Sequence, residues 1–138
     1  MMATNVMVVD DAAFMRQMLK RILTQMGCEV VAEAGDGEEA TTKYLDVKPD
    51  LVTMDLVMPK MGGLEALEKI KGLDDKARVL IISAIDQRKS LMDALRLGAA
   101  DYVVKPFNNE QVVQAVTRVL EHSEPAAAKA DAAKPAAS

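Results

Sequence analysis

Short aliphatic runs recur along this chain and alternate with stretches in which apolar residues return at helical spacing. The runs are apolar at nearly every position, which is typical of strands in a sheet that is covered on both faces. Strands that alternate with helices build a parallel sheet with helices packed against it. We therefore expect an α/β fold, with strands over residues 5–9, 29–33, 51–54, 79–82 and 101–104.

The stretches between and after these runs predict helices. In the first, apolar side chains recur every three or four residues from Phe14 to Met26, and Gly27 supplies the left-handed residue that ends it. The second helix should end before Pro49, because the residue ahead of a proline avoids helical backbone angles. Crossovers between the parallel strands should be right-handed. The later helices are expected over residues 38–47, 64–71, 87–97 and 110–121.

Polar side chains follow four of these runs, at the point where each run ends. They are Asp10 with Asp11, then Asp55, Ser83 and Lys105. The carboxyl ends of neighbouring parallel strands meet at one edge of a sheet, and open parallel sheets bind their ligands there. The sequence therefore predicts a single site that contains three carboxylates, a hydroxyl group and an amine.

The three carboxylates predict a bound cation. Taken alone, Asp10 and Asp11 before a helix would be more typical of an N-cap and a solvated neighbour. With Asp55 on the adjacent strand, however, three like charges raise one another's pKa unless a cation lies between them. Mg²⁺ is the preferred candidate, because it takes oxygen ligands and retains water. A cation would also let Asp55 act as a nucleophile toward a phosphoryl group.

Six segments, in this order, resemble the receiver domain of the response-regulator family of bacterial two-component signalling. The match covers about residues 5–121. It implies a flavodoxin-like three-layer sandwich around a single doubly wound, five-stranded parallel sheet, with the strand order 2-1-3-4-5 that is known for this fold. The segments are Val9-Asp10-Asp11, residues 54–59, Met61-Gly62-Gly63, Ser83-Ala84, Gly98-Ala99 and residues 101–107.

The resemblance implies that Asp55 accepts a phosphoryl group from a histidine of a partner kinase. Asp10, Asp11 and Asp55, together with the backbone carbonyl of Val57, would hold the Mg²⁺ ion. Val57 and Ile85 stand two residues after Asp55 and Ser83. Because neither side chain can orient water, we hypothesise that self-dephosphorylation is slow and that a separate phosphatase ends the signal.

The resemblance also assigns a switch. Ser83 would bind a phosphoryl oxygen, and Lys105 would pair with phosphorylated Asp55. Tyr102 matches the switch aromatic of the family, whose ring turns inward when the hydroxyl group moves toward the phosphate. The family typically has a cis peptide bond at Lys105-Pro106, which directs the lysine into the site.

These features are most similar to a stand-alone receiver of the chemotaxis branch, which is not an enzyme and is expected to act as a monomer. Its partners would be a histidine kinase and either a flagellar motor switch protein or another output protein. The expected output surface combines the fourth helix, the fifth strand and the fifth helix, and carries Arg96, Gln111, Gln114 and Arg118.

Three alternatives remain open from the sequence. The chain could be a receiver detached from a transcriptional regulator. An aspartyl-nucleophile phosphatase would place an acidic residue two positions after its nucleophile, where this chain has Val57. A flavin or nucleotide binder would need a phosphate-binding loop after the first strand, where Asp10 and Asp11 would repel the ligand.

Composition excludes several classes of function and completes the domain prediction. A net charge of −4 does not favour binding to nucleic acid or to an anionic membrane. Cys28 is the only cysteine, and the N-terminus lacks a basic signal-peptide region, so we expect a cytoplasmic protein. Residues 1–122 should form the receiver domain, His122 should cap the last helix, and residues 123–138 should be a disordered tail.

Overall fold

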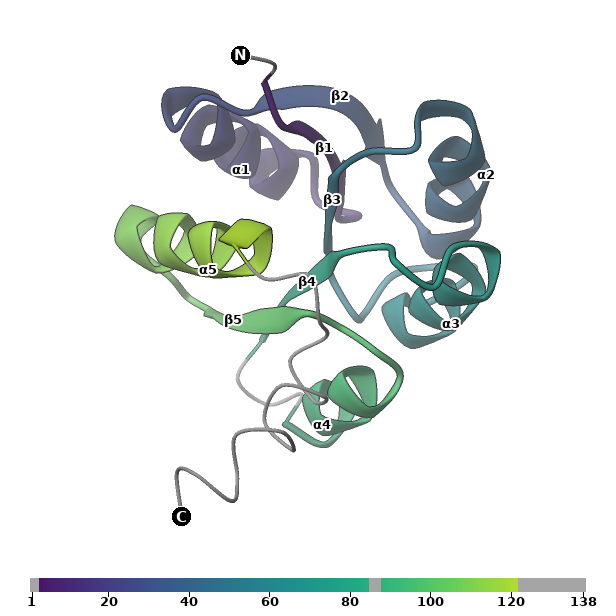
Figure 1. Ribbon diagram of the computed structural model, residues 1–138. Coiled ribbons are helices and arrows are strands. Elements are labelled where there is room, and N and C mark those ends of the chain that lie inside the picture. The colour runs from purple at the N-terminus through teal and green to yellow at the C-terminus, as the bar shows by residue number, and fades with distance from the viewer. Residues whose placement is uncertain (1–2, 85–87, 122–138) are drawn as a thin grey trace, which may run out of the picture.

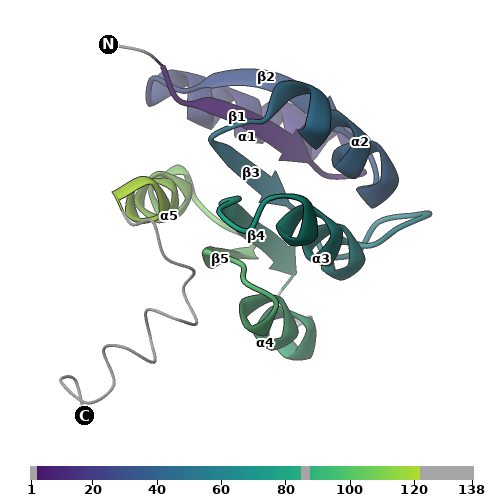
Figure 2. The ribbon, with the colours of Figure 1, turned by 45° about the vertical axis from the view of Figure 1, so that its right-hand side comes forward.

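A parallel five-stranded sheet separates two layers of helices (Figures 1 and 2). The computed structural model describes residues 3–84 and 88–121. The strand order is β2-β1-β3-β4-β5, as predicted, and the weakly apolar β2 lies at one edge. The strands are β1 (Asn5–Val9), β2 (Glu29–Ala34), β3 (Leu51–Met54), β4 (Val79–Ala84) and β5 (Asp101–Lys105).

Helices cover both faces of the sheet and complete the three-layer flavodoxin-like fold. Figure 1 shows α1 and α5 on one side of the sheet, with α2, α3 and α4 on the other. Apart from the start of the fourth helix, the predicted helices agree with the observed ones to within about two residues at each end, which is the usual uncertainty of helix boundaries. The helices are α1 (Ala13–Gln25), α2 (Gly37–Val47), α3 (Gly63–Leu73), α4 (Arg88–Arg96) and α5 (Asn109–Glu121).

Alternation along the strands divides the interior into two cores. In β1, Val6 and Val8 pack toward α1 and α5, whereas Met7 and Val9 pack toward α2, α3 and α4. Successive strand residues point to opposite faces, so a strand buried on both sides must be apolar throughout. Each fully buried Leu or Val contributes roughly 1.5–3 kcal/mol relative to an exposed one. The two cores therefore hold the sheet rigidly and fix the positions of its strand ends.

Three strands extend further than predicted: β2 continues to Ala34, β4 to Ala84 and β5 to Lys105. The sequence placed Ser83 and Lys105 after their strands, and this was wrong, because β4 includes Ser83 and β5 ends with Lys105. The parallel pairing of β4 with β5 continues through Ser83 with Val104 and Ala84 with Lys105. Backbone pairing does not depend on side-chain polarity, so the end of an apolar run underestimates the length of the strand.

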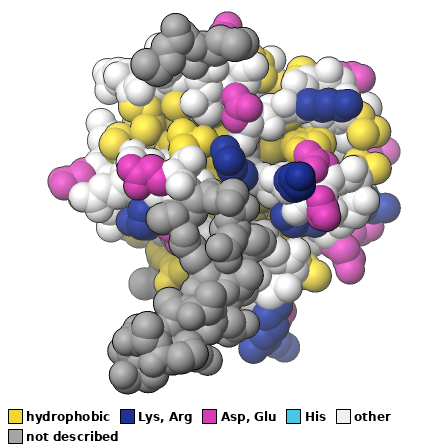
Figure 3. Space-filling view, in the orientation of Figure 1, with side chains coloured by type: hydrophobic (Ala, Val, Ile, Leu, Met, Phe, Trp, Pro, Cys, Tyr) yellow, Lys and Arg dark blue, Asp and Glu magenta, His cyan; other side chains and the backbone are white. Residues whose placement is uncertain are grey.

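Some sequence predictions concern residues outside the described ranges. These are the role of Ile85, the start of the fourth helix at Gln87, the capping by His122 and the disordered tail over 123–138. Within residues 3–84 and 88–121, no helix is both long enough and apolar enough to cross a membrane. On the face drawn in Figure 3, acidic and basic side chains are interspersed, without the continuous basic patch that nucleic acid binding requires.

Candidate functional site

The carboxyl ends of β1 and β3 bring the predicted aspartates together. These strands pair in parallel, with Val9 opposite Met54. The pairing continues one residue further, because the Asp55 N–H donates to the Val9 carbonyl at 3.0 Å. On the other side of β1, the Asp10 N–H donates to the carbonyl of Ala34 in β2 at 3.0 Å. The sheet itself therefore holds the backbone N–H group of each aspartate.

Three carboxylates converge at this edge. One oxygen atom from each of Asp10, Asp11 and Asp55 lies within 4.8 Å of the other two. Asp10 and Asp55 are buried, with exposed fractions of 1% and 8%, whereas Asp11 is exposed. The Asp10 side chain does not cap α1, since the N-cap residue is Ala12, and instead accepts a hydrogen bond from the Ala12 N–H at 2.9 Å.

Lys105 faces two of these carboxylates. Its Nζ atom lies 2.9 Å from Asp10 Oδ2 and 3.4 Å from Asp55 Oδ2. The Lys105-Pro106 peptide bond is cis, as expected from the resemblance. One ammonium group facing three carboxylates leaves an excess of negative charge in the cluster. The site therefore has the charge and the oxygen ligands for a divalent cation.

The pKa values of the buried groups reflect this crowding. Burial raises the pKa of Asp55, and the neighbouring carboxylate of Asp10 raises it further, although Lys105 opposes both effects. Burial alone would lower the pKa of Lys105, but its contacts with Asp10 and Asp55 outweigh burial and raise it. The lysine therefore stays charged, while the Asp55 carboxylate gains from any additional cation nearby.

The loop after β3 requires a glycine at Gly63, where α3 begins. A Cβ atom at Gly63 would overlap the main-chain carbonyl of Asp55, so only glycine permits this close approach of α3 to the site. The Gly63 N–H donates to the Leu56 carbonyl at 2.9 Å. In the same loop, the Val57 N–H makes a long hydrogen bond of 3.5 Å to Asp55 Oδ1, and the Val57 side chain is exposed.

Ser83 and Tyr102 lie on the strands that follow β3 in the sheet. Ser83 is near the carboxyl end of β4, fully buried, and its Oγ atom has no hydrogen-bond partner within residues 3–84 and 88–121. A buried hydroxyl group without a partner is unfavourable, so Ser83 is suited to receive one from a ligand. Tyr102 lies on the edge strand β5, with 42% of its surface exposed.

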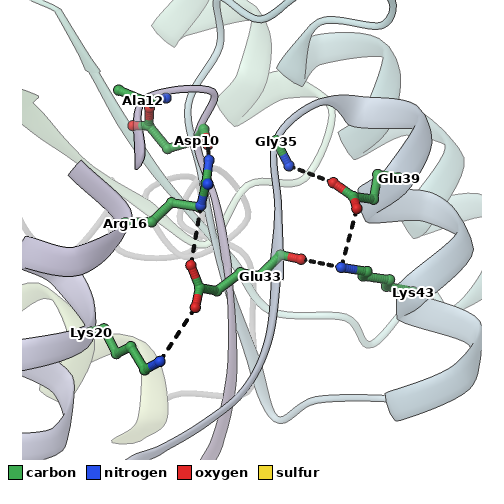
Figure 4. A network of polar contacts seen from close by, with 8 residues as sticks. All are labelled: Asp10, Ala12, Arg16, Lys20, Glu33, Gly35, Glu39 and Lys43. Atoms are coloured by element: carbon green, nitrogen blue, oxygen red, sulfur yellow. Dashed lines mark hydrogen bonds and ion pairs between the residues drawn. The ribbon is translucent and has the colours of Figure 1, made fainter. Parts of the chain in front are cut away.

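Sequence reasoning missed Arg16, which belongs to the polar network in Figure 4. Its Nη1 atom donates to the main-chain carbonyl of Asp10 at 2.6 Å, and its Nε atom donates to Glu33 Oε1 at 3.1 Å. On the sequence, Arg16 is one of several polar residues on the outer face of α1, which is typical of a solvated helix surface. The signal that distinguishes it is its position on the first turns of the helix that follows Asp10 and Asp11.

Comparisons with known proteins agree with this geometry. Residues 6–117 match the response regulator receiver domain family. The chain is 49% identical to the chemotaxis protein CheY of Bacillus subtilis over 119 residues, covering 86% of this chain and 99% of that one. It is 47% identical to CheY of Thermotoga maritima over 118 residues, covering 86% and 98% of the two chains.

A solved structure shows the same fold. The CheX-CheY-BeF3-Mg²⁺ complex from Borrelia burgdorferi contains a chain with a TM-score of 0.81 and 40% identity, and the match covers 84% of this chain and 88% of that one. These relatives are signalling proteins, and the family match extends over nearly all of the described residues. The chain therefore belongs to the receiver domain family of two-component response regulators, and within that family it is similar to the CheY chemotaxis proteins.

Proposed function

We propose that this chain is a response regulator that is activated by phosphorylation of Asp55. The observation that supports the proposal most strongly is the convergence of Asp10, Asp11 and Asp55 within 4.8 Å, with Lys105 in contact with two of them. The phosphodonor would be a phosphohistidine of a partner kinase. We also place the protein in the cytoplasm, since its single cysteine fits a reducing compartment.

The donor set fits Mg²⁺. Asp10, Asp11 and Asp55 would hold the ion, and we assign the Val57 carbonyl as a further ligand. Carboxylate and carbonyl oxygens suit this hard cation, and the excess negative charge of the cluster favours it. When bound, the ion neutralises charge on the incoming phosphoryl group.

Phosphoryl transfer to Asp55 follows from the contacts of its side chain. A carboxylate oxygen of Asp55 forms a bond to phosphorus while the phosphorus–nitrogen bond of the phosphohistidine breaks, and the bonding electrons return to the imidazole. Lys105 stabilises the carboxylate before transfer and the phosphoryl oxygens after it. The product is an acyl phosphate on the protein itself, so the chain serves as a single-turnover acceptor and not as an enzyme.

Ser83 and Tyr102 would convert the modification into a change of surface. The unpaired Ser83 hydroxyl group gains an acceptor when a phosphoryl oxygen is nearby, which gives a reason for β4 to move toward the site. Tyr102 lies on the adjacent strand with its ring partly exposed, so it is free to turn toward the space that this movement opens. The new charge at Asp55 is thus coupled to the surface of α4 and β5.

The α4-β5-α5 surface is the proposed output site, and we propose that a partner protein binds mainly to its apolar part. The side chains of the four polar residues predicted for it each make a contact within the chain. Arg118 pairs with Asp101, and Arg96 pairs with Asp93. Between α4 and β5 lies a groove of about 460 Å³, in which Met92 is 48% exposed. We infer that an apolar segment of a flagellar motor switch protein or another output protein binds here. The groove is lined by Arg88, Leu91, Met92, Leu95, Tyr102 and Val104.

The remaining assignments follow from the same proposal. The receiver domain is proposed to span residues 1–122, of which 6–117 match the family. One structural relative is a CheY in complex with CheX. For this chain we propose a separate phosphatase partner, since the exposed Val57 side chain beside Asp55 cannot orient an attacking water molecule. The chain is proposed to act as a monomer.

Incubation with acetyl phosphate tests the proposal. Intact-mass analysis should show the addition of one phosphoryl group when Mg²⁺ is present, and Asp55→Asn should abolish it. Asp46→Asn is the matched control, because it removes an exposed carboxylate on α2 outside the cluster. A wild-type protein that remains unmodified in the presence of Mg²⁺ would rule the proposal out.

A further inference from the structure

We propose that Arg16 is a positioning residue for the cation site, because it holds the main chain of Asp10 from within α1. This inference rests on the proposed function. Arg16 does not touch the carboxylates themselves. Its guanidinium group bonds the Asp10 carbonyl oxygen at 2.6 Å and Glu33 Oε1 at 3.1 Å, and so links the β1–α1 loop to the edge strand β2 (Figure 4).

The β1–α1 loop needs this support because the helix after it begins without a side-chain cap. The N-cap residue is Ala12, which offers no polar side chain, and the first turn of α1 contains no acidic residue. A helix whose N-cap residue is Ala is less stable by about 1 kcal/mol than one capped by Ser, Thr, Asp or Asn. The sheet holds the N–H group of Asp10, whereas its carbonyl group and the whole of Asp11 lie on the loop side, so fraying of this turn would move Asp11 and loosen Asp10. The Arg16 contact joins the helix to the loop across this weak point.

Glu33 fixes the direction of the guanidinium group and balances its charge. The Arg16 and Glu33 side chains are partly buried, with exposed fractions of 22% and 31%. Glu33 also accepts a contact from Lys20 Nζ at 3.4 Å, and its own main-chain carbonyl accepts a hydrogen bond from Lys43. A guanidinium group without a counter-charge would repel Mg²⁺ from the neighbouring carboxylate cluster. Because Glu33 neutralises Arg16, the arginine can hold the loop without weakening Mg²⁺ binding.

The geometry specifies arginine rather than lysine. Two nitrogen atoms of one planar guanidinium group reach two acceptors on different elements, and a single ammonium group cannot reproduce this fork. Groups that orient metal-binding residues from outside the ligand set typically change metal affinity by about 10-fold or more when they are removed. We therefore expect Arg16 to act on Mg²⁺ affinity beyond any effect on stability.

The test is a titration of ¹⁵N-labelled protein with MgCl₂, without a phosphodonor, following the backbone amide shifts. Arg16→Met keeps the aliphatic stem but loses both hydrogen bonds, and it should raise the Kd for Mg²⁺ by about 10-fold. Arg16→Lys should raise it by a smaller factor. Lys20→Met is the control, because Lys20 shares Glu33 with Arg16, and it should leave the Kd unchanged. Thermal unfolding in EDTA shows whether each variant folds without the ion.

The outcomes separate the two proposals. If the wild-type protein does not bind Mg²⁺, the proposed function fails, whatever the variants do. If the wild type binds and folded Arg16→Met binds equally well, Arg16 has no positioning role. Should Arg16→Met not fold, an Arg16→Lys variant with the wild-type Kd overturns the inference. An equal loss of Mg²⁺ affinity in Lys20→Met would also overturn the inference, since the loss would then arise from removing any positive charge beside Glu33.

Discussion

Removal of the Lys105 ammonium group should destabilise the metal-free protein in a way that Mg²⁺ reverses. Lys105 Nζ lies 2.9 Å from Asp10 Oδ2, and Asp10 is only 1% exposed. In Lys105→Met, the aliphatic stem remains but two neighbouring carboxylates lose their nearest cation. Water stabilises a largely buried charge only in part, so the folded state should lose much of the free energy of this contact.

The expected loss of stability in Lys105→Met follows from how deeply the ion pairs of Lys105 are buried. Breaking a buried ion pair costs about 3–5 kcal/mol. The Lys105 side chain is 21% exposed, and water can therefore reach the site, so we expect a loss of about 2–3 kcal/mol. For a domain of this size the melting temperature changes by about 4 °C per kcal/mol. Lys105→Met should therefore melt about 10 °C below the wild type in EDTA.

Mg²⁺ should recover most of this loss, because the ion supplies the missing positive charge and no longer competes with the ammonium group. The assay is thermal unfolding followed by circular dichroism, in EDTA and over a series of MgCl₂ concentrations. Lys20→Met is the control, since this lysine is 45% exposed in its ion pair and should contribute at most about 1 kcal/mol. A Lys105→Met variant as stable as the wild type in EDTA would show that Lys105 does not stabilise the two carboxylates.

Three further changes test other parts of the structure. Tyr44→Phe removes a 2.8 Å hydrogen bond to Asp74 and should cost about 1 kcal/mol in urea unfolding. This bond is the main cause that lowers the pKa of Asp74. Its contribution to the free energy of unfolding should therefore be present above the unfolded-state pKa of Asp74 and disappear as the pH falls through the lower folded-state pKa. In Tyr44→Phe, the free energy of unfolding should consequently fall less steeply with decreasing pH in this acid range. Thr53→Val removes a buried hydroxyl group that has no hydrogen-bond partner in the described part of the chain, and it should raise the free energy of unfolding by about 1 kcal/mol. A lower free energy of unfolding in this variant would show that the hydroxyl group has a hydrogen-bond partner in solution. Gly63→Ala should abolish Mg²⁺ binding, because its methyl group would overlap a main-chain carbonyl of the site, whereas Gly72→Ala in the same helix meets no atom within 4 Å and should stabilise by up to about 1 kcal/mol.

The sequence was sufficient for the carboxylate cluster because the apolar runs of β1 and β3 end where these two strands end. Asp10 and Asp55 each come directly after an apolar run, and pairing of the central strands leaves little freedom in where such residues lie. The strand order, in contrast, came from the family resemblance. Apolar runs by themselves do not say which strands are neighbours, because every central strand is buried on both faces.

The sequence could not predict the contact between Arg16 and Glu33. This contact depends on the rotation of α1 about its axis and on the register of β2, which shifts at an irregularity between Val6 and Met7. Polar residues on a helix surface are usually solvated, so their pattern does not identify the one that turns inward. The need for glycine at Gly63 was hidden for a similar reason, since it arises from the approach of α3 to the carbonyl of Asp55.

Locating the modified residue shows which of the three aspartates is the phosphoacceptor. After incubation with acetyl phosphate, reduction with borohydride and peptide mass spectrometry identify the aspartate that carried an acyl phosphate. We expect modification at Asp55 alone, and only when Mg²⁺ is present. Modification at Asp10 or Asp11 instead, or equal modification in EDTA, would contradict the claim that three carboxylates and a cation make Asp55 the phosphoacceptor.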